Sequence, residues 1–381
     1  MYNFRLVYYS ILLTLYLGIF EAANITNFKL RQLSLIFRHG DRMPKQLPDR
    51  FPNDPNMWDS FQPMGSGGLT NAGKLRMYQF GEHLRRRYVD FLGNRYEEKK
   101  LYGVSSNTTR TQMSLQLVQT ALYPPKTNKD QRWHPTLDWQ PIPLYYFEYK
   151  QNRLFDPDKC KQFVDELATV MNSTEVQRKI DKYRELLEEI RIATGKKSPI
   201  NLDDASLLHN NLEIEEKLNL TMKPWMKDLL KDARLKGLRL LHYEIKSYTD
   251  LMRRFNSGFW LRQVTEDMLK VRNGDSGVDG KTLLYSGHDT NILNILQALG
   301  VWDSHFPEFS SAVIFELWSQ DEKYFLRIFY YLGIPSEFKD YTEAICGSKD
   351  CPVDTFTELM KSKLILDDEK NCEITGEGYY S

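Results

Sequence analysis

The densest group of reactive side chains in this sequence is the heptapeptide R-H-G-D-R-M-P at residues 38–44. The guanidinium forks of Arg38 and Arg42 match the oxygens of a phosphoryl group, which would then lie against the ring of His39. A neutral imidazole can attack phosphorus once binding has placed the phosphoryl group in line. The heptapeptide therefore predicts a phosphate site with His39 as the nucleophile, and the plainer interpretation is a solvated basic turn.

A second cluster, S-G-H-D-T-N at residues 286–291, places a histidine directly before a carboxylate. A protonated Asp289 can donate its proton to a leaving alkoxide, and a bound phosphate anion would raise the pKa of that carboxyl group. His288 can donate a hydrogen bond to a non-bridging phosphoryl oxygen. The plainer interpretation is that Asp289 caps a following helix. Arg110 supplies a further guanidinium, although taken alone it is typical of a protein surface.

Each of these residues follows a segment typical of a buried strand. Residues 33–37 are apolar apart from Ser34 and stop at the first cluster, and residues 282–286 run into the second. A short strand is also predicted at residues 101–105, before Arg110. The ends of strands are where α/β enzymes hold their reactive groups, so this arrangement favours the catalytic interpretation.

Helical patterns alternate with these strands. An amphipathic pattern follows Thr70, whose hydroxyl is a candidate N-cap, and residues 111–122 and 291–299 have helical spacing. Residues 312–318 and 324–333 alternate like two paired strands. We predict an α/β fold with a mixed central sheet and helices on both faces, built from residues 24–123 and 256–381.

The middle of the chain differs in character. After an entry rich in Pro, Trp and Tyr, residues 161–171, 176–192 and 226–240 have long, charged helical patterns. Residues 124–255 are therefore predicted to form an inserted α-helical cap domain.

The composition excludes several classes of protein. The chain has 381 residues, of which 41% are hydrophobic and 27% charged, so it is long enough and apolar enough to fold around a sizeable core. Lys and Arg together number 51 and so do Asp and Glu. Because the formal net charge is zero, there is no bulk field to hold a nucleic acid or an anionic membrane. We expect no nucleic-acid partner.

The N-terminus indicates export. Residues 1–23 contain Arg5, an apolar run over residues 7–20 and the small residues Ala22 and Ala23, which is the pattern of a secretory signal peptide. The run is shorter than a bilayer span, although an uncleaved anchor is the alternative. The sequence shows no second apolar stretch of spanning length, so the predicted product is secreted without a stable membrane anchor. A lysosomal or secretory-granule location is the alternative.

The cysteines and sequons agree with an oxidising compartment. Four cysteines allow three pairings, and the short spacing of Cys346 and Cys351 favours a local bridge, leaving Cys160 to pair with Cys372. The spacing does not fit a zinc site, and no metal ligand set is predicted. Glycosylation sequons, which also arise by chance, begin at Asn24, Asn107, Asn172 and Asn219.

The order of these motifs resembles the histidine acid phosphatase family, the clade-2 histidine phosphatases that include secreted insect venom-type and prostatic-type acid phosphatases. The resemblance rests on R-H-G-D-R-M-P, S-N-T-T-R-T-Q-M-S at residues 106–114 and Y-S-G-H-D-T-N at residues 285–291. Residues 68–73 leading to 81–88, and 309–312 leading to 316–317, match as well. The resemblance extends over nearly all of the chain after the leader.

The resemblance implies an acid phosphatase that hydrolyses small phosphate monoesters without a cofactor or metal. His39 would form a covalent phosphohistidine, and Asp289 would be the general acid and then the base for water. The phosphoryl oxygens would be bound by four side chains: Arg38, Arg42, Arg110 and His288. Asp41 is expected to be structural, and a homodimer is expected by family analogy.

Two departures limit the resemblance. The vertebrate enzymes have a third disulfide that is missing here, and the H-D-T-N ending also occurs in phytase-like relatives. Trp225 resembles an aromatic residue that lines the family's substrate pocket, but an ordinary core tryptophan is an equal interpretation. Three alternatives therefore stay open: an exported protein that binds small ligands, a phytase and a lysophosphatidate phosphatase. The neutral overall charge argues against a phytase, whose polyanionic substrate needs a basic pocket.

Overall fold

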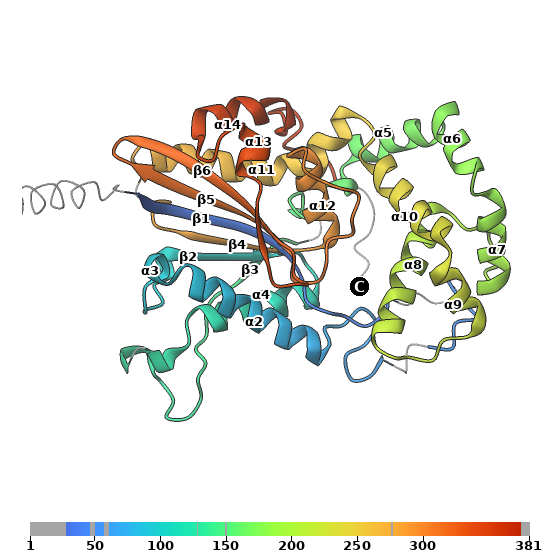
Figure 1. Ribbon diagram of the computed structural model, residues 1–381, viewed down its shortest axis with the longest axis horizontal. Helices are drawn as coiled ribbons and strands as arrows, with labels where there is room; N and C mark the ends of the chain where they lie inside the picture. Colours follow the sequence, from blue (N-terminus) through green and yellow to red (C-terminus); the bar gives the residue numbers. More distant parts are fainter. Residues whose placement is uncertain are drawn as a thin grey trace, which may run out of the picture.

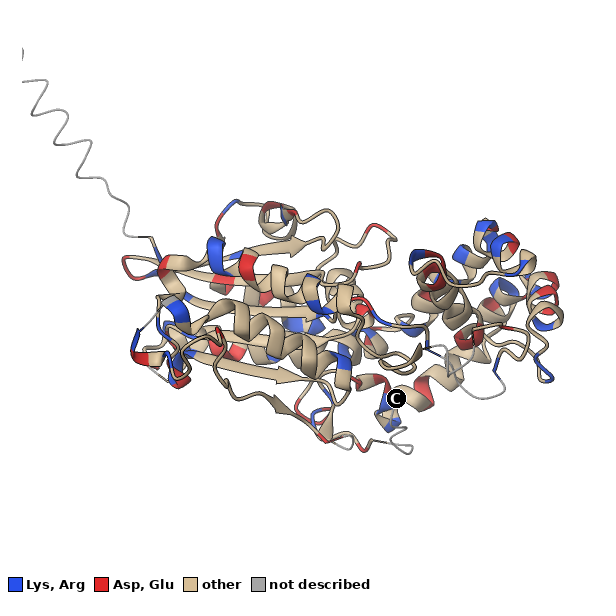
Figure 2. Cartoon of the chain, turned by 90° about the horizontal axis from the view of Figure 1, so that it is seen from below, with Lys and Arg blue, Asp and Glu red and all other residues tan. Residues whose placement is uncertain are grey.

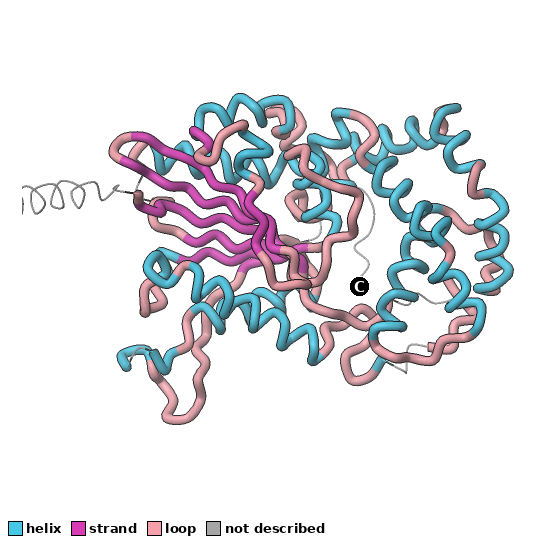
Figure 3. Tube along the Cα trace, viewed as in Figure 1, coloured by secondary structure: helices cyan, strands magenta, loops and turns pink. Residues whose placement is uncertain are grey.

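A computed structural model describes residues 28–45, 50–56, 61–127, 129–148, 151–275 and 277–374. The predicted leader, residues 1–23, and the sequon at Asn24 lie outside these ranges. The strands gather in one body and a separate group of helices lies beside their ends (Figures 1 and 3). The predicted α/β fold with a mixed sheet is confirmed.

The sheet has eight strands in the order β3-β2-β4-β1-β5-β6-β7, with β8 paired to β6. The strands are β1 (Lys29–Arg38), β2 (Leu101–Ser105), β3 (Tyr145–Tyr146), β4 (Thr282–Gly287), β5 (Ala312–Gln320), β6 (Lys323–Tyr331), β7 (Phe338–Asp340) and β8 (Cys351–Pro352). Strands β3, β2, β4 and β1 run parallel, whereas β5, β6, β7 and β8 pair antiparallel to their neighbours. The five strands predicted from the sequence are all present.

The register of β1 and β4 brings the two reactive clusters to one edge of the sheet. Phe37 lies opposite Ser286 and Arg38 opposite Gly287. The next amide along, that of His39, donates to the carbonyl of Gly287 at 3.1 Å. Because parallel strands end at the same edge, the residues that follow β1, β2 and β4 all face one region.

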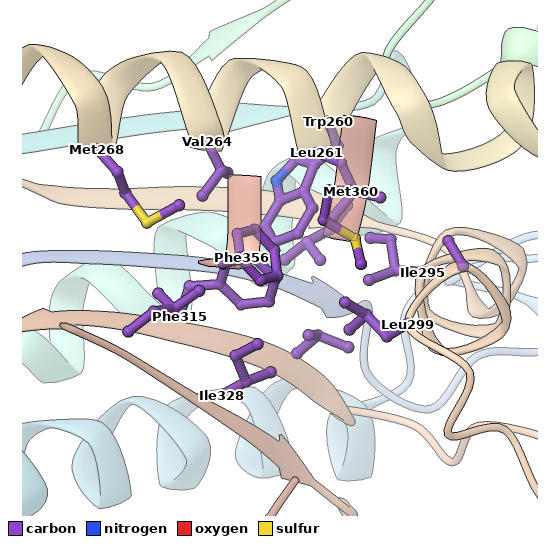
Figure 4. Packing of buried hydrophobic residues seen from close by; sticks show 14 of the residues in the cluster. Trp260, Leu261, Val264, Met268, Ile295, Leu299, Phe315, Ile328, Phe356 and Met360 are labelled. Carbon is purple, nitrogen blue, oxygen red and sulfur yellow. The ribbon is translucent and has the colours of Figure 1, made fainter. Parts of the chain in front are cut away.

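Helices cover both faces of the sheet, as predicted. One face packs against α2 (Asn71–Arg87) and α4 (Thr109–Leu122), with α3 (Val89–Leu92) following α2. The other packs against α11 (Asp250–Arg272), α12 (Asp289–Ala298) and α14 (Val353–Met360), with α13 (Thr342–Cys346) nearby. Figure 4 shows Trp260 of α11 and Phe356 of α14 packed against Phe315 of β5. Truncating a buried aromatic of this kind to Ala typically costs about 3–5 kcal/mol.

The start of α2 fixes the loop that follows β1. Thr70 caps the helix, its hydroxyl accepting from the Gly73 amide at 3.0 Å, as the sequence predicts. The backbone of Gly73 then packs directly on the first cluster. A Cβ atom at Gly73 would lie 2.1 Å from the Asp41 carbonyl oxygen, and one at Gly40 would lie 2.4 Å from that of Gly73. Both positions therefore require glycine for a close backbone approach.

The remaining helices form a group with an apolar core of their own. They are α5 (Lys161–Met171), α6 (Thr174–Asp181), α7 (Arg184–Thr194), α8 (Leu202–Lys217), α9 (Pro224–Lys231) and α10 (Ala233–Lys246). The two longest helices predicted here are each broken. The side chain of Asp232 accepts from the Arg234 amide and caps α10, whereas the break between α6 and α7 falls at Tyr183, whose side chain makes no capping hydrogen bond. Basic and acidic residues are interspersed over this group (Figure 2).

The predicted insertion is not helical throughout. Within residues 124–255, Tyr145 and Tyr146 form β3, which pairs with β2 at the edge of the sheet. The helical group also packs against Phe51 and Ile365, which lie outside the predicted range. The division into core and cap stays a prediction, with a helical part that begins later than residue 124.

The predicted disulfide pairing is present. Cys160, at the start of α5, is bonded to Cys372, and Cys346 of α13 is bonded to Cys351 of β8. The first bond joins the helical group to the end of the described chain. Over the described ranges, no helix is long and apolar enough to cross a membrane.

A buried carboxyl pair predicts a pH-dependent stability. Glu215 of α8 is fully buried, and burial together with the neighbouring Asp54 raises its pKa to about 9. A carboxyl whose pKa is raised by folding stabilises the fold below its ordinary pKa of about 4.3, and this contribution is lost as the pH rises toward 9. In Glu215→Gln, the drop in melting temperature between pH 5 and pH 8 should be smaller by a few degrees.

The control is Glu216→Gln, which changes an exposed neighbour on the same helix and should behave like the wild type. If the melting temperature of Glu215→Gln fell between pH 5 and pH 8 by as much as that of the wild type, the raised pKa of Glu215 would be contradicted.

Candidate active site

His39 follows β1 directly and is 3% exposed. Its Nδ1 lies 2.8 Å from the Gly40 carbonyl oxygen. A carbonyl only accepts, so Nδ1 carries the hydrogen and the lone pair of the neutral ring is on Nε2. This is the tautomer that a nucleophilic imidazole needs.

The second histidine, His288, lies beside the first. The two ring centroids are 5.6 Å apart, and Nε2 of His288 is 2.9 Å from the hydroxyl of Ser106, which follows β2. Burial, and then the cations Arg110 and Arg38, lower the pKa of His39 well below its usual range. Burial and Arg110 lower that of His288 in the same way. The site therefore favours the neutral form of both rings.

Arg38, the last residue of β1, is held by the loop that precedes β5. Its guanidinium lies 3.9 Å from the ring centroid of Phe309, and Nη1 donates to the Pro307 carbonyl at 2.6 Å. Nη2 lies 3.3 Å from Oδ2 of Asp289. The planar stacking and the carbonyl contact fix the direction of the fork before any ligand arrives.

Arg42 and Arg110 add two more buried cations. Burial and the neighbouring arginines lower the pKa of Arg42 to about 9, and burial lowers that of Arg110 to about 10, so both remain charged in acid. Arg42 donates to Asn210 of α8 and to the Met43 carbonyl. The Nε–H of Arg110 has no hydrogen-bond partner among the described residues. Such a group of mutually repelling cations favours an anion between them.

Asp289 is the first residue of α12. The N-cap is His288, whose amide donates to Oδ1 of Asn291 at 2.9 Å, so the interpretation of Asp289 as the cap is wrong. Burial raises the pKa of Asp289, but Arg38, Arg239 and Arg42 outweigh this effect and lower it to about 2. The carboxylate is therefore ionised in the unliganded protein, and a phosphoryl anion that engages these arginines would favour its protonation.

Asp41, expected to be structural, points to α2. Its carboxylate accepts from Arg76, and its carbonyl accepts from the Thr70 amide at 2.9 Å. These contacts fasten the first cluster to the start of α2.

The structure adds a cation that the sequence analysis missed. Arg239 of α10 is 1% exposed, and its Nη2 lies 3.8 Å from Oδ2 of Asp289. One sequence signal was available: Arg239 follows Leu235 by four residues and precedes His242 by three, which places a charge in the buried stripe of the helix.

The remaining predicted residues lie away from this cluster or on the surface. Trp225, in α9, packs against the core of the helical group, which favours the core interpretation. The sequon residues Asn107, Asn172 and Asn219 are exposed. Within the part of the chain that the structure describes, no three His, Cys, Asp or Glu side chains are grouped to hold a metal ion.

Comparison with known proteins assigns the family. The profile of the histidine phosphatase superfamily (branch 2) matches residues 29–331. The chain belongs to this superfamily. It is 37% identical to a venom acid phosphatase of Apis mellifera, over 91% of this chain and 88% of that protein. It is also 29% identical to human prostatic acid phosphatase, over 91% and 89% of the two chains.

Solved structures agree on the fold. A phytase from Citrobacter braakii superimposes with a TM-score of 0.64 at 16% identity, covering 91% of this chain and all of that one. The predicted family and fold are thus confirmed, and the histidine phosphatase fold accounts for the meeting of residues 38–42 with residues 288–289.

Proposed function

We propose that this histidine phosphatase hydrolyses small phosphate monoesters in acid through a covalent phosphohistidine. The observation that carries the proposal is the neutral His39, with its lone pair on Nε2, among Arg38, Arg42 and Arg110. The names of the acid phosphatase relatives support the same reaction.

In the first step, Nε2 of His39 attacks phosphorus and the bond from phosphorus to the ester oxygen breaks. Asp289 gives its proton to that oxygen, so that the alcohol leaves neutral. Arg38, Arg42, Arg110 and His288 donate to the non-bridging oxygens and stabilise the charge that a metal ion stabilises in other phosphotransfer enzymes.

In the second step, water attacks the phosphohistidine and the N–P bond breaks. Asp289, now ionised, accepts a proton from the water, and the imidazole leaves as the neutral ring. The pKa of the carboxyl group is about 2 without ligand, so its protonation requires both acid and the bound phosphoryl anion. This requirement explains why the reaction would favour low pH.

The cap, the compartment and the oligomer belong to the proposal as well. We propose that α5–α10 form the cap, because Asn210 of α8 and Arg239 of α10 reach the phosphate site. Export is supported by the predicted leader, two disulfides and three exposed sequons. Homodimerisation is supported by large exposed apolar side chains near edge strand β3: Trp133, Leu137, Trp139, Tyr145 and Tyr146.

Removing the nucleophile should abolish catalysis. We expect His39→Ala to reduce kcat on p-nitrophenyl phosphate at least about 1,000-fold, because the substitution removes the proposed nucleophile of the covalent step. Wild-type activity should peak in acid and be unaffected by EDTA. The matched control is His134→Ala, which replaces a histidine in the loop before β3. A folded but inert wild type would instead favour the ligand-binding alternative.

Replacing the acid should discriminate between leaving groups. In Asp289→Asn, hydrolysis of an alkyl phosphate such as 2-glycerol phosphate should fall about 100- to 10,000-fold, since an alkoxide leaves poorly without a proton. p-Nitrophenyl phosphate should lose far less, because its phenolate leaves unaided. Equal losses on both substrates, measured as kcat, would rule out the role of Asp289 as acid.

The proposed export and dimerisation can be tested by mass measurements on the protein recovered from the medium of an insect cell culture. Its mass should show that residues 1–23 have been removed and that N-glycans, which peptide N-glycosidase releases, are attached. Light scattering coupled to size-exclusion chromatography should give the mass of a dimer. Retention of the leader would favour the uncleaved anchor, and a monomeric mass would exclude the dimer.

A further inference from the structure

Arg239 is a buried cation in the helical group with partners on several elements. Its Nη1 donates to Oε2 of Glu213 at 2.7 Å, and its Nη2 to the Tyr243 hydroxyl at 3.4 Å. The guanidinium carbon lies 3.9 Å from the ring centroid of Phe306, in the loop that also holds Arg38. A guanidinium stacked and bonded in this way has one orientation.

From that orientation Arg239 reaches the carboxylate of Asp289. Its Nη2 lies 3.8 Å from Oδ2, the same oxygen that lies 3.3 Å from Nη2 of Arg38. One guanidinium comes from β1 and the other from α10. The acid is therefore held between the sheet and the helical group.

Four neighbouring side chains alternate in the sign of their charge: Glu213, Arg239, Asp289 and Arg38. Burial raises the pKa of Glu213, but His209 and Arg239 lower it to about 2, so this carboxylate is ionised. Burial disfavours the charged form of Arg239, whereas Tyr243, Glu213 and Asp289 favour it and raise the pKa overall. Glu213 thus offsets part of the field that Arg239 exerts on Asp289.

We propose that Arg239 is a positioning residue for Asp289, holding its carboxyl group beside Arg38 and setting its strength as an acid toward the leaving group. The proposal rests on the role of Asp289 as proton donor proposed above. Neither the sequence motifs nor the family resemblance assigns Arg239 any part in the reaction.

The groups that face Asp289 divide into two sets. Arg38, Arg42, Arg110 and His288 surround the phosphoryl position and would donate to its oxygens when substrate binds. Arg239 is held by Glu213 and Tyr243, so it remains beside Asp289 throughout the reaction. It is the cation that stabilises the carboxylate formed when Asp289 has given up its proton.

Two variants should move the pH profile in opposite directions. Removing the cation in Arg239→Met raises the pKa of Asp289, so the acid stays protonated to higher pH. The descending limb of kcat on 2-glycerol phosphate should then move up by about 1 pH unit, and the plateau should fall about 10-fold as the carboxyl group loses its fixed position. In Glu213→Gln, no negative charge cancels part of the positive field of Arg239 at Asp289. The pKa of Asp289 then falls, and the descending limb should move to lower pH.

Two controls separate charge and position from folding. Arg239→Lys keeps the charge without the fork, so the limb should stay near that of the wild type while the plateau falls. Arg234→Met removes a half-exposed arginine of the same helix, paired with Asp232 and Glu189, and should leave limb and plateau unchanged. On p-nitrophenyl phosphate, Arg239→Met should change kcat less than about 3-fold, because that leaving group needs little protonation.

The experiment measures kcat against pH for both substrates, with the melting temperature of each variant. Equal losses on both substrates with an unmoved limb would show that Arg239 is merely structural and would overturn the inference. If Arg239→Met does not fold, a limb unmoved in Glu213→Gln overturns it as well. Undiminished alkyl hydrolysis in Asp289→Asn would instead overturn the proposed role of the acid itself.

Discussion

The parallel pairing of β1 with β4 is the constraint on which the site depends. Its register places Arg38 beside Gly287, so His39 and Asp289, the proposed nucleophile and acid, lie at the same edge although they are far apart in the sequence. Side chains alternate along a strand, so a slip of one residue would turn Leu33 and Phe37 away from α2 and α4. The apolar packing on the two faces of the sheet therefore fixes the geometry of the chemistry at its edge.

The same edge concentrates positive charge in a chain with no net charge. Arg38, Arg42 and Arg110 are all buried around His39, and their repulsion is offset within the protein chiefly by Asp289. Such an arrangement is held by the rest of the fold rather than by the charges themselves: Phe309 stacks on Arg38, and Asn210 accepts from Arg42. A bound phosphoryl anion would supply the missing negative charge, which is a physical reason for the site to select it.

The sequence predicts the parts of this site whose positions follow from strand ends. His39 and Asp289 each stand in a dense cluster directly after an apolar run, and the pairing of all four cysteines follows from spacing and number. Arg239 could not be assigned to the site in this way: its place in the buried stripe of α10 indicates burial, but its contact with Asp289 depends on how α10 packs against the rest of the fold. The breaks in the predicted helices were missed for the opposite reason. They are local, and at the break between α9 and α10 the capping side chain of Asp232 outweighs the charged helical periodicity around it.

The sheet and the helical group contribute different residues to the site. The sheet edge carries His39, Asp289 and the arginines proposed to bind phosphate, whereas α8 and α10 carry Glu213 and Arg239, which are paired with each other and, through Arg239, with Asp289. A shift of α10, which carries Arg239 but none of the four proposed phosphate ligands, would therefore alter the field at Asp289. The pKa of Asp289 therefore depends on cations from two parts of the fold: Arg38 and Arg42 at the sheet edge, and Arg239 on α10.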